Sequence, residues 1–177
     1  MLLDLVSERP EGVEFVVASP AGPLHEELSR EGVAVRQVPG TAGSLKLHPL
    51  HTPVALAQLA AAGVAVRRIA HSERIQVLHA NSPRAALSAI LASQGGGPPV
   101  VTHLHDAAAE GRAGALGSRV LERSRLLIAN SHWTASTFPA GVRGRTEVVH
   151  NPVTSRGSPP GTCAMTRGPR SASRPAS

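Results

Sequence analysis

Aromatic residues are scarce in this sequence: it has no Tyr, one Trp and two Phe among its 177 residues. Aliphatic side chains must therefore build the core, because hydrophobic residues still make up 41% of the chain. Cysteine is nearly absent too, and since Cys163 is the only one, an internal disulfide is excluded. A chain without disulfides is typical of a reducing compartment, so we expect a cytoplasmic protein. Its length fits one domain with a sizeable core.

A cluster of basic residues is also lacking in the first 153 residues, although the formal net charge of the chain is +6. The last 24 residues hold four arginines and no acid, so +6 minus 4 leaves +2 for residues 1–153. A nucleic-acid-binding protein needs Lys and Arg gathered in a stripe on one face. We therefore expect no nucleic-acid partner.

Long hydrophobic runs are missing as well. The most apolar stretch, Pro53–Val66, has 14 residues and ends at two arginines. A helix that crosses a bilayer needs about 20 apolar residues. At the start of the chain there is no basic segment before an apolar run, and Asp4 interrupts that run, so no signal peptide is expected. The sequence predicts no transmembrane segment.

Short aliphatic runs alternate with helical patterns along the chain. Several runs are continuously apolar, as in parallel strands that are covered on both faces. The pairs Thr52-Pro53 and Ser82-Pro83 are typical helix starts, and Gly32 and Gly95 are typical helix ends. The predicted strands are 13–18, 34–38, 75–79, 100–103, 126–130 and 146–150, and the predicted helices are 2–8, 24–31, 53–74, 83–93, 115–123 and 132–138. This alternation predicts the α/β class, with a Rossmann-like, doubly wound parallel sheet.

The two ends of the sequence differ from the rest. The chain opens in a predicted helix, whereas domains of this class begin with a strand, so we expect the first strand of the sheet to be missing. Residues 154–177 have no periodicity and almost no large apolar side chains. They cannot bury enough surface to offset the entropy of ordering, which predicts a disordered tail. The expected organisation is an incomplete Rossmann-like domain at 1–153 and a low-complexity tail at 154–177.

Polar residues gather where the predicted strands end. Ligands of open parallel sheets bind at the carboxyl ends of the strands, so these residues are the candidates for a site. Each also has a purely structural interpretation, since Ser82 and Ser131 can cap the following helices and a single His can satisfy a backbone group. Taken together, they favour a rim that faces a ligand. The four groups are His79-Ala-Asn-Ser82, His103-Leu-His-Asp106, Asn130-Ser-His132 and His150-Asn-Pro152.

Other chemistries have weaker support. His103 and His105 stand two apart after a strand and point the same way, which can be a metal site. Such a site needs an acidic ligand from a late strand, and Asp4 and Asp106 are the only aspartates, neither of them late. The sequence also lacks a Gly-x-Ser-x-Gly elbow, a Walker A loop and a Gly-x-Gly-x-x-Gly turn after a strand. We therefore predict no metal site and no nucleophilic serine.

Five ordered segments resemble the amino-terminal domain of the family-4-like glycosyltransferases of the GT-B fold. They run from about residue 10 to residue 153 in the order that this family has. The segments are LHEELSREG followed by 33–39, VLHANS at 77–82, PVVTHLHD at 99–106, LIANS at 127–131 and VVHNPV at 148–153.

The resemblance implies half of a retaining transferase that moves a sugar from a nucleotide-sugar co-substrate to an acceptor, without a further cofactor. His105 matches the histidine that reaches toward the transferred sugar, and it is the candidate catalytic residue. The resemblance implies a sugar or a lipid-linked sugar as the acceptor. Because many enzymes of this family work at the inner face of the membrane, contact of the 45–74 region with lipid is one interpretation, and a core helix is the simpler one. The candidate acceptor- or sugar-binding residues are Asn81, Ser82, Asp106, Ser131 and Asn151.

The sequence departs from the family pattern at both ends. The first strand with its Gly-rich loop is not present before Met1, and Thr154 stands where the family continues into the nucleotide-sugar domain. Without that domain, the leaving diphosphate has no electrostatic stabilisation, so we expect the chain alone to be inactive. Two alternatives remain: a binding or scaffold module that pairs with a separate donor-binding subunit, and an unrelated Rossmann-like nucleotide-binding enzyme.

Overall fold

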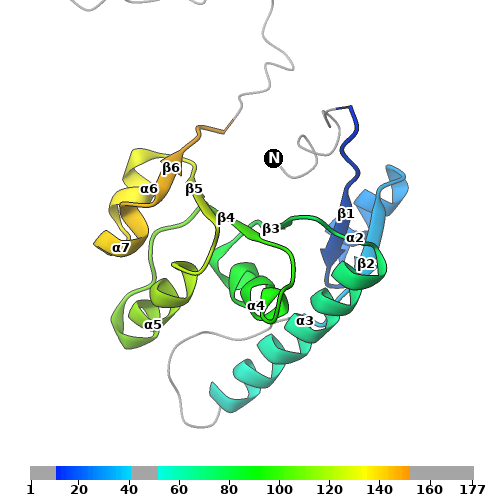
Figure 1. Ribbon diagram of the computed structural model, residues 1–177, viewed down its shortest axis with the longest axis horizontal. Helices are drawn as coiled ribbons and strands as arrows, with labels where there is room; N and C mark the ends of the chain where they lie inside the picture. Colours follow the sequence, from blue (N-terminus) through cyan, green and yellow to red (C-terminus); the bar gives the residue numbers. More distant parts are fainter. Residues whose placement is uncertain (1–10, 41–51, 152–177) are drawn as a thin grey trace, which may run out of the picture.

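The structure is a computed structural model that describes residues 11–40 and 52–151. Within these ranges six short strands alternate with six helices (Figure 1). The strands are β1 (Val16–Ser19), β2 (Ala34–Gln37), β3 (Leu78–Ala80), β4 (Val100–Leu104), β5 (Leu126–Ala129) and β6 (Thr146–Val148). The helices are α2 (Pro23–Arg30), α3 (Thr52–Ser72), α4 (Pro83–Ser93), α5 (Gly111–Leu121), α6 (His132–Ser136) and α7 (Ala140–Arg143). The predicted α/β class is confirmed.

Each predicted strand corresponds to an observed one, shifted by three residues or fewer at its start. The predicted helix 83–93 has the bounds of α4, and Ser82 caps it as expected, with its Oγ accepting a hydrogen bond from the Ala85 N–H at 3.1 Å. Gly32 and Gly95 follow α2 and α4 with φ of 75° and 71°, a conformation that favours glycine at helix ends. The predicted helix 2–8 and the predicted tail 154–177 lie outside the described residues.

The strands form two parallel sheets rather than one. β1 pairs with β2, and β3, β4, β5 and β6 pair in that order. Within residues 11–40 and 52–151, no strand hydrogen-bonds to both β1 and β3, so the sheet breaks between these two strands. The Rossmann-like character is carried by the four-stranded sheet, in which helices connect parallel neighbours.

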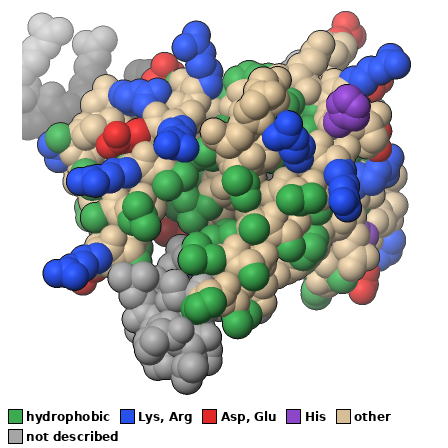
Figure 2. Space-filling view, turned by 60° about the horizontal axis from the view of Figure 1, so that its bottom comes forward, with side chains coloured by type: hydrophobic (Ala, Val, Ile, Leu, Met, Phe, Trp, Pro, Cys, Tyr) green, Lys and Arg blue, Asp and Glu red, His purple; other side chains and the backbone are tan. Residues whose placement is uncertain are grey.

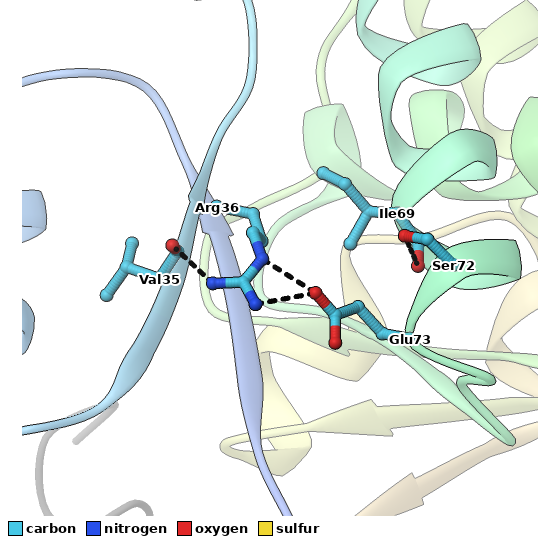
Figure 3. A network of polar contacts seen from close by, with 5 residues as sticks. All are labelled: Val35, Arg36, Ile69, Ser72 and Glu73. Carbon is cyan, nitrogen blue, oxygen red and sulfur yellow. Dashed lines mark hydrogen bonds and ion pairs between the residues drawn. The ribbon is translucent and has the colours of Figure 1, made fainter.

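A polar contact links the smaller sheet to the end of α3 (Figure 3). The guanidinium of Arg36, on β2, donates from Nε to Glu73 Oε1 at 2.7 Å, and its Nη2 lies 2.6 Å from the same oxygen. Nη1 of Arg36 also donates to the carbonyl of Val35 at 3.2 Å. Because both charged side chains are partly exposed to water, such a pair contributes only about 0–1 kcal/mol. The contact fixes orientation more than it stabilises the fold.

The core lies between the four-stranded sheet and α4, with α5, α6 and α7 closing it at the side. It is aliphatic and rich in alanine, as the scarcity of aromatic residues predicts, and Phe138 is its one aromatic member. Two buried hydroxyls pair inside it, since Thr102 Oγ1 and Ser124 Oγ are 2.9 Å apart, which satisfies both. The buried members are Ala80, Ala86, Ala89, Ile90, Val100, Leu104, Leu121, Leu127, Ala129, Ala135, Phe138 and Val142.

Helix α3 packs along α4 at a close approach made possible by Gly63. A Cβ at this position would lie 2.8 Å from a Leu91 methyl carbon, too close for van der Waals contact. By length and composition alone, the stretch Pro53–Ser72 of α3 could cross a membrane, with 20 residues and a mean hydropathy of 1.3. The expectation of no transmembrane segment rests on the 14 residues before Arg67, whereas the stretch that is long and apolar enough continues past Arg67 and Arg68 to Ser72.

The packing of β5 gives a test of the core. Leu127→Ala removes a side chain that is 0% exposed, and it should lower the free energy of unfolding by about 2–5 kcal/mol because it leaves a cavity. The matched control is Leu116→Ala on α5, where the side chain is 63% exposed and the loss should stay within about 0.5 kcal/mol. Urea unfolding followed by circular dichroism measures both. Equal losses for the two variants would contradict the assignment of the core.

Candidate functional site

The predicted site residues follow consecutive strands of the four-stranded sheet. Asn81 follows β3, His105 follows β4, Ser131 stands two residues after β5 and Asn151 three residues after β6. Because these strands are parallel neighbours, their carboxyl ends share one edge of the sheet. The structure therefore places all four on the same edge, which we call the carboxyl edge.

A hydrogen bond joins the first two of these residues. His105 Nε2 lies 2.9 Å from Asn81 Oδ1, and since an amide oxygen only accepts, the imidazole donates through an Nε2–H group. In the neutral ring, Nδ1 then carries the lone pair and can accept a hydrogen bond. This contact bridges the ends of β3 and β4 and sets the orientation of the imidazole.

Asn130 ties the end of β5 to the same network. Its Nδ2 donates to the carbonyl oxygen of His105 at 3.3 Å, and its Oδ1 accepts from Thr134 Oγ1 at 2.7 Å. Asn130 stands at a predicted strand end but is not among the predicted site residues. Its position, immediately after a strand and one residue before a predicted helix cap, was the available signal. Asn130 holds the backbone of His105 in place.

The two serines have structural roles in this arrangement. Besides the Ser82 cap of α4 described above, Ser131 Oγ accepts from the Thr134 N–H at 3.0 Å and caps α6. The Ser131 hydroxyl also lies 2.9 Å from Thr134 Oγ1, whose own hydrogen goes to Asn130. The helix-cap interpretation of both serines is thus confirmed, and contact with a ligand stays a prediction for them.

Asp106 and Asn151 are exposed and stand apart from this network. Among the residues that the structure describes, no hydrogen bond joins either of them to His105 or Asn81. Asp106 still acts on the site through its charge, because the carboxylate opposes the lowering of the His105 pKa. Near Asn151, the rings of His150 and His132 meet edge to face at 6.1 Å between centroids. The residues that follow β5 and β6 thus form a second cluster on the rim, separate from the His105–Asn81 contact.

Three histidines pack together beside the network. The ring centroids of His103 and His105 are 4.0 Å apart, and those of His79 and His103 are 6.0 Å apart. Burial lowers the pKa of His103 to about 4, with further lowering from the neighbouring His105 and His79. Burial is also the main cause that lowers the pKa of His79 and of His105. At neutral pH all three rings are therefore uncharged.

His103 and His105 do project to the same side, as their spacing predicts. Nevertheless, within residues 11–40 and 52–151 no group of three His, Cys, Asp or Glu side chains is placed to hold a metal ion. The buried Nε2 of His103 has no hydrogen-bond partner there. The arrangement is a set of neutral donors and acceptors, which suits a hydroxyl-rich ligand better than a cation or a phosphate.

A hollow lies at the carboxyl ends of β1 and β2, apart from the carboxyl edge of the four-stranded sheet. It has a volume of about 480 Å³ and is open to solvent, and its walls are largely apolar. It contains no titratable side chain, so it offers space beside the smaller sheet but little chemistry. Its lining residues are Pro20, Ala21, Gln37, Val38, Pro39 and Gly40.

Two of the three comparisons with known proteins gave matches. Residues 8–155 match the model of the family described as glycosyltransferase family 4. A comparison with curated protein sequences gave no match.

Among solved structures, Anabaena HepE in complex with UDP and glucose is 23% identical with a TM-score of 0.59, over 77% of this chain and 36% of that one. Acinetobacter baumannii MurG is 19% identical with a TM-score of 0.52, over 89% and 42%. A glycosyltransferase from Rickettsia africae is 15% identical with a TM-score of 0.58, over 86% and 37%. The chain thus shares the fold of these proteins and spans less than half of their length.

The histidine cluster predicts a dependence of stability on pH. In the unfolded chain His103 titrates near 6.5, whereas in the folded protein its pKa is about 4. Between these values the unfolded state binds more protons, so the stability is complete above pH about 6.5 and falls as the pH drops toward about 4. Urea unfolding at several pH values in this window measures the slope. His103→Gln should make the slope shallower, and an unchanged slope in that variant would contradict the pKa assignment.

Proposed function

This chain belongs to glycosyltransferase family 4, and from that premise we propose that it is the acceptor-side half of a retaining glycosyltransferase. The reaction moves a sugar from a nucleotide-sugar co-substrate to a sugar or lipid-linked acceptor. The proposed domain extends over residues 1–153, with 154–177 as a separate tail. The carboxyl edge is the acceptor-facing surface, and a separate half of the enzyme grips the nucleotide.

The hydrogen bond between His105 and Asn81 carries this proposal. It leaves Nδ1 of a neutral imidazole free to accept a hydrogen bond, and sugar hydroxyls are donors. Burial, which lowers the pKa of His105, keeps the ring in the accepting form at neutral pH. We assign His105 the role of contacting the transferred sugar, with Asn81 and Asn130 as positioning residues. Ser82, Asp106, Ser131 and Asn151 complete the proposed rim.

Positioning is the contribution that this half can make to catalysis. Holding two reactants in a reactive geometry can supply about 7–11 kcal/mol in ideal cases, and neutral groups suffice for it. Stabilising the leaving diphosphate needs charged or dipolar groups aimed at the phosphates, which is usually the largest single contribution. HepE was solved with UDP-glucose, and it is more than twice as long as the matched part of this chain. We therefore place the nucleotide-binding groups in a second half, in the same longer protein or in a partner subunit.

We further propose that the protein acts in the cytoplasm at the inner face of the membrane. A cytoplasmic location is supported by the single cysteine, Cys163, and by the nucleotide-sugar co-substrate. A lipid-linked acceptor would account for the location at the inner face of the membrane.

Binding of acceptor-like sugars tests the role of His105. Methyl glycosides and disaccharides, used as a panel of probes, should shift the ring resonances of His105 in the 177-residue chain. His105→Ala should weaken binding about fivefold, because one neutral hydrogen bond contributes about 1 kcal/mol. His71→Ala, at an exposed position on α3, is the matched control and should bind like the unaltered chain. If His105→Ala also bound as the unaltered chain does, the assignment of His105 would be wrong.

Transfer by the 177 residues alone tests the division of labour. We expect no detectable hydrolysis or transfer from UDP-glucose, because the groups that stabilise the diphosphate lie in the other half. Release of UDP in a coupled assay is the measurement, with a complete family member as the positive control. Release of UDP by the 177-residue chain would contradict the division into two halves. If His105→Ala then abolished that release, the assignment of His105 to the site would still stand.

A further inference from the structure

Trp133 has the most exposed large apolar side chain of the described residues. Its exposed fraction is 66%, and it is the only Trp in a chain with two Phe and no Tyr. The other exposed large apolar side chains are Val and Leu, and several of them lie on α3, α4 and α5, on the side of the molecule that Figure 2 shows. Aromatic rings normally contribute to a core by burial, as Phe138 does here at 4% exposure. The indole is therefore the one large flat apolar surface that the described residues present to solvent.

The position of Trp133 places it at the carboxyl edge. It is the second residue of α6, and α6 begins three residues after the end of β5. The Cα–Cβ bonds of a helix tilt toward the end at which the helix starts, so the Trp133 side chain is directed back toward this edge. β5 is the neighbour of β4, which His105 follows. Trp133 and His105 thus come from adjacent strand ends of one edge.

Hydrogen bonds on both sides of Trp133 fix its backbone. Its carbonyl oxygen accepts from Ser136 Oγ at 2.7 Å. The next residue, Thr134, is 2% exposed, donates through its N–H to Ser131 Oγ at 3.0 Å and through its hydroxyl to Asn130 Oδ1 at 2.7 Å. A side chain on a backbone that is already ordered loses less entropy when it binds a ligand. The network at the end of β5 therefore preorganises the indole as well as the site.

We propose that Trp133 is a stacking platform for a pyranose ring of the acceptor, in a subsite beside the one that His105 contacts. The C–H groups on one face of a pyranose are apolar and slightly positive, so they pack on the negative face of an indole. The hydroxyls at the margin of the same ring need hydrogen-bond partners. His132 and His150, whose rings meet edge to face at 6.1 Å next to this position, supply ring nitrogens for them.

The surroundings of Trp133 favour a sugar over other ligands that cover a Trp. A protein partner buries a Trp at the centre of a wide apolar patch. Of the large apolar side chains that the structure shows as exposed, only Val149 also follows β5 or β6. A nucleobase also stacks on indole, but its phosphates need basic side chains nearby. Arg143 and Arg145 precede β6 and so lie toward the opposite edge.

This inference rests on the proposed function, since it takes the carboxyl edge as the acceptor-facing surface. It adds the length and shape of the acceptor. Neighbouring strands lie about 4.8 Å apart, close to the length of one sugar unit, so one acceptor can contact both His105 and Trp133. The acceptor class is therefore an oligosaccharide end of at least two units, with a pyranose that has an uninterrupted apolar face at Trp133.

Fluorescence is the test, because Trp133 is the only Trp and the emission of the chain reports on it alone. The probes for the 177-residue chain are the disaccharides cellobiose, lactose and chitobiose, and the linear polyol sorbitol, which has hydroxyls but no ring. Stacking of a sugar removes water from the indole. We expect a saturable shift of the emission to shorter wavelength with at least one disaccharide and no shift with sorbitol.

Variants at Trp133 separate stacking from hydrogen bonding. With the disaccharide that binds, Trp133→Ala should weaken binding about tenfold in calorimetry, whereas Trp133→Phe, which keeps a ring, should weaken it only about threefold. The matched control is Leu116→Ala on α5, where an apolar side chain of similar exposure (63%) is removed away from the edge. This control should bind as the unaltered chain does. Thermal unfolding verifies that every variant is folded.

Equal binding by Trp133→Ala and Leu116→Ala would overturn the inference. If His105→Ala still weakened binding, the proposed function would stand without the platform. Conversely, a loss in Trp133→Ala with none in His105→Ala would support the platform and refute the role of His105. A shift of the emission that grows with protein concentration in the absence of sugar would also overturn the inference, because a second copy would then cover the indole. If none of the disaccharides bound, both proposals would be wrong.

Discussion

The parallel pairing of β3, β4, β5 and β6 is the constraint on which the proposed site depends. A parallel neighbour can be reached only by a crossover, and here the crossovers from β3 to β4 and from β4 to β5 are α4 and α5. The pairing brings the carboxyl ends to one edge, where Asn81, His105 and Asn130 meet. The crossovers put α4 and α5 on one face of the sheet, where α3 joins them. Edge and face are therefore separate surfaces of one scaffold.

The carboxyl edge and the helical face of the sheet differ in electrostatic character. At the edge, burial holds the pKa of His79, His103 and His105 below its usual value, so the site is neutral at physiological pH. The helices α3, α4 and α5, on the face of the sheet, carry arginines and contain no carboxylate. Neutral donors and acceptors of the kind found at the carboxyl edge can discriminate among sugar hydroxyls by hydrogen bonding.

The sequence predicted the order of the elements well because each signal is local. The bounds of α4 followed from Ser82-Pro83 at its start and Gly95 after its end. Helix α7 was missed, since its four residues are too few for a periodic pattern and its formation depends on the burial of Val142. α5 begins at Gly111 rather than at 115, because packing accepts glycines that propensity argues against. In each case a tertiary contact overrides a local preference.

The candidate site was predictable only in part. In a parallel sheet, the residues that follow successive strands share one edge. The sequence alone therefore predicts that His105 and Asn81 lie at the same edge. Which side chains bond to each other depends on spatial neighbours that the sequence does not reveal. Thr134 is one such neighbour, because it draws Asn130 and Ser131 into a cap network, which gives Ser131 a structural role and Asn130 a positioning role.

The tautomer of His105 is the most direct test of the account, because the proposed contact with a sugar needs a free Nδ1. Nitrogen NMR of the 177-residue chain, labelled at its histidine rings, distinguishes the two neutral tautomers and the charged ring. We predict a neutral His105 at pH about 7 with its proton on Nε2, and a change at Nδ1 when a sugar acceptor is added. A protonated ring, or a neutral ring with its proton on Nδ1, would contradict the account.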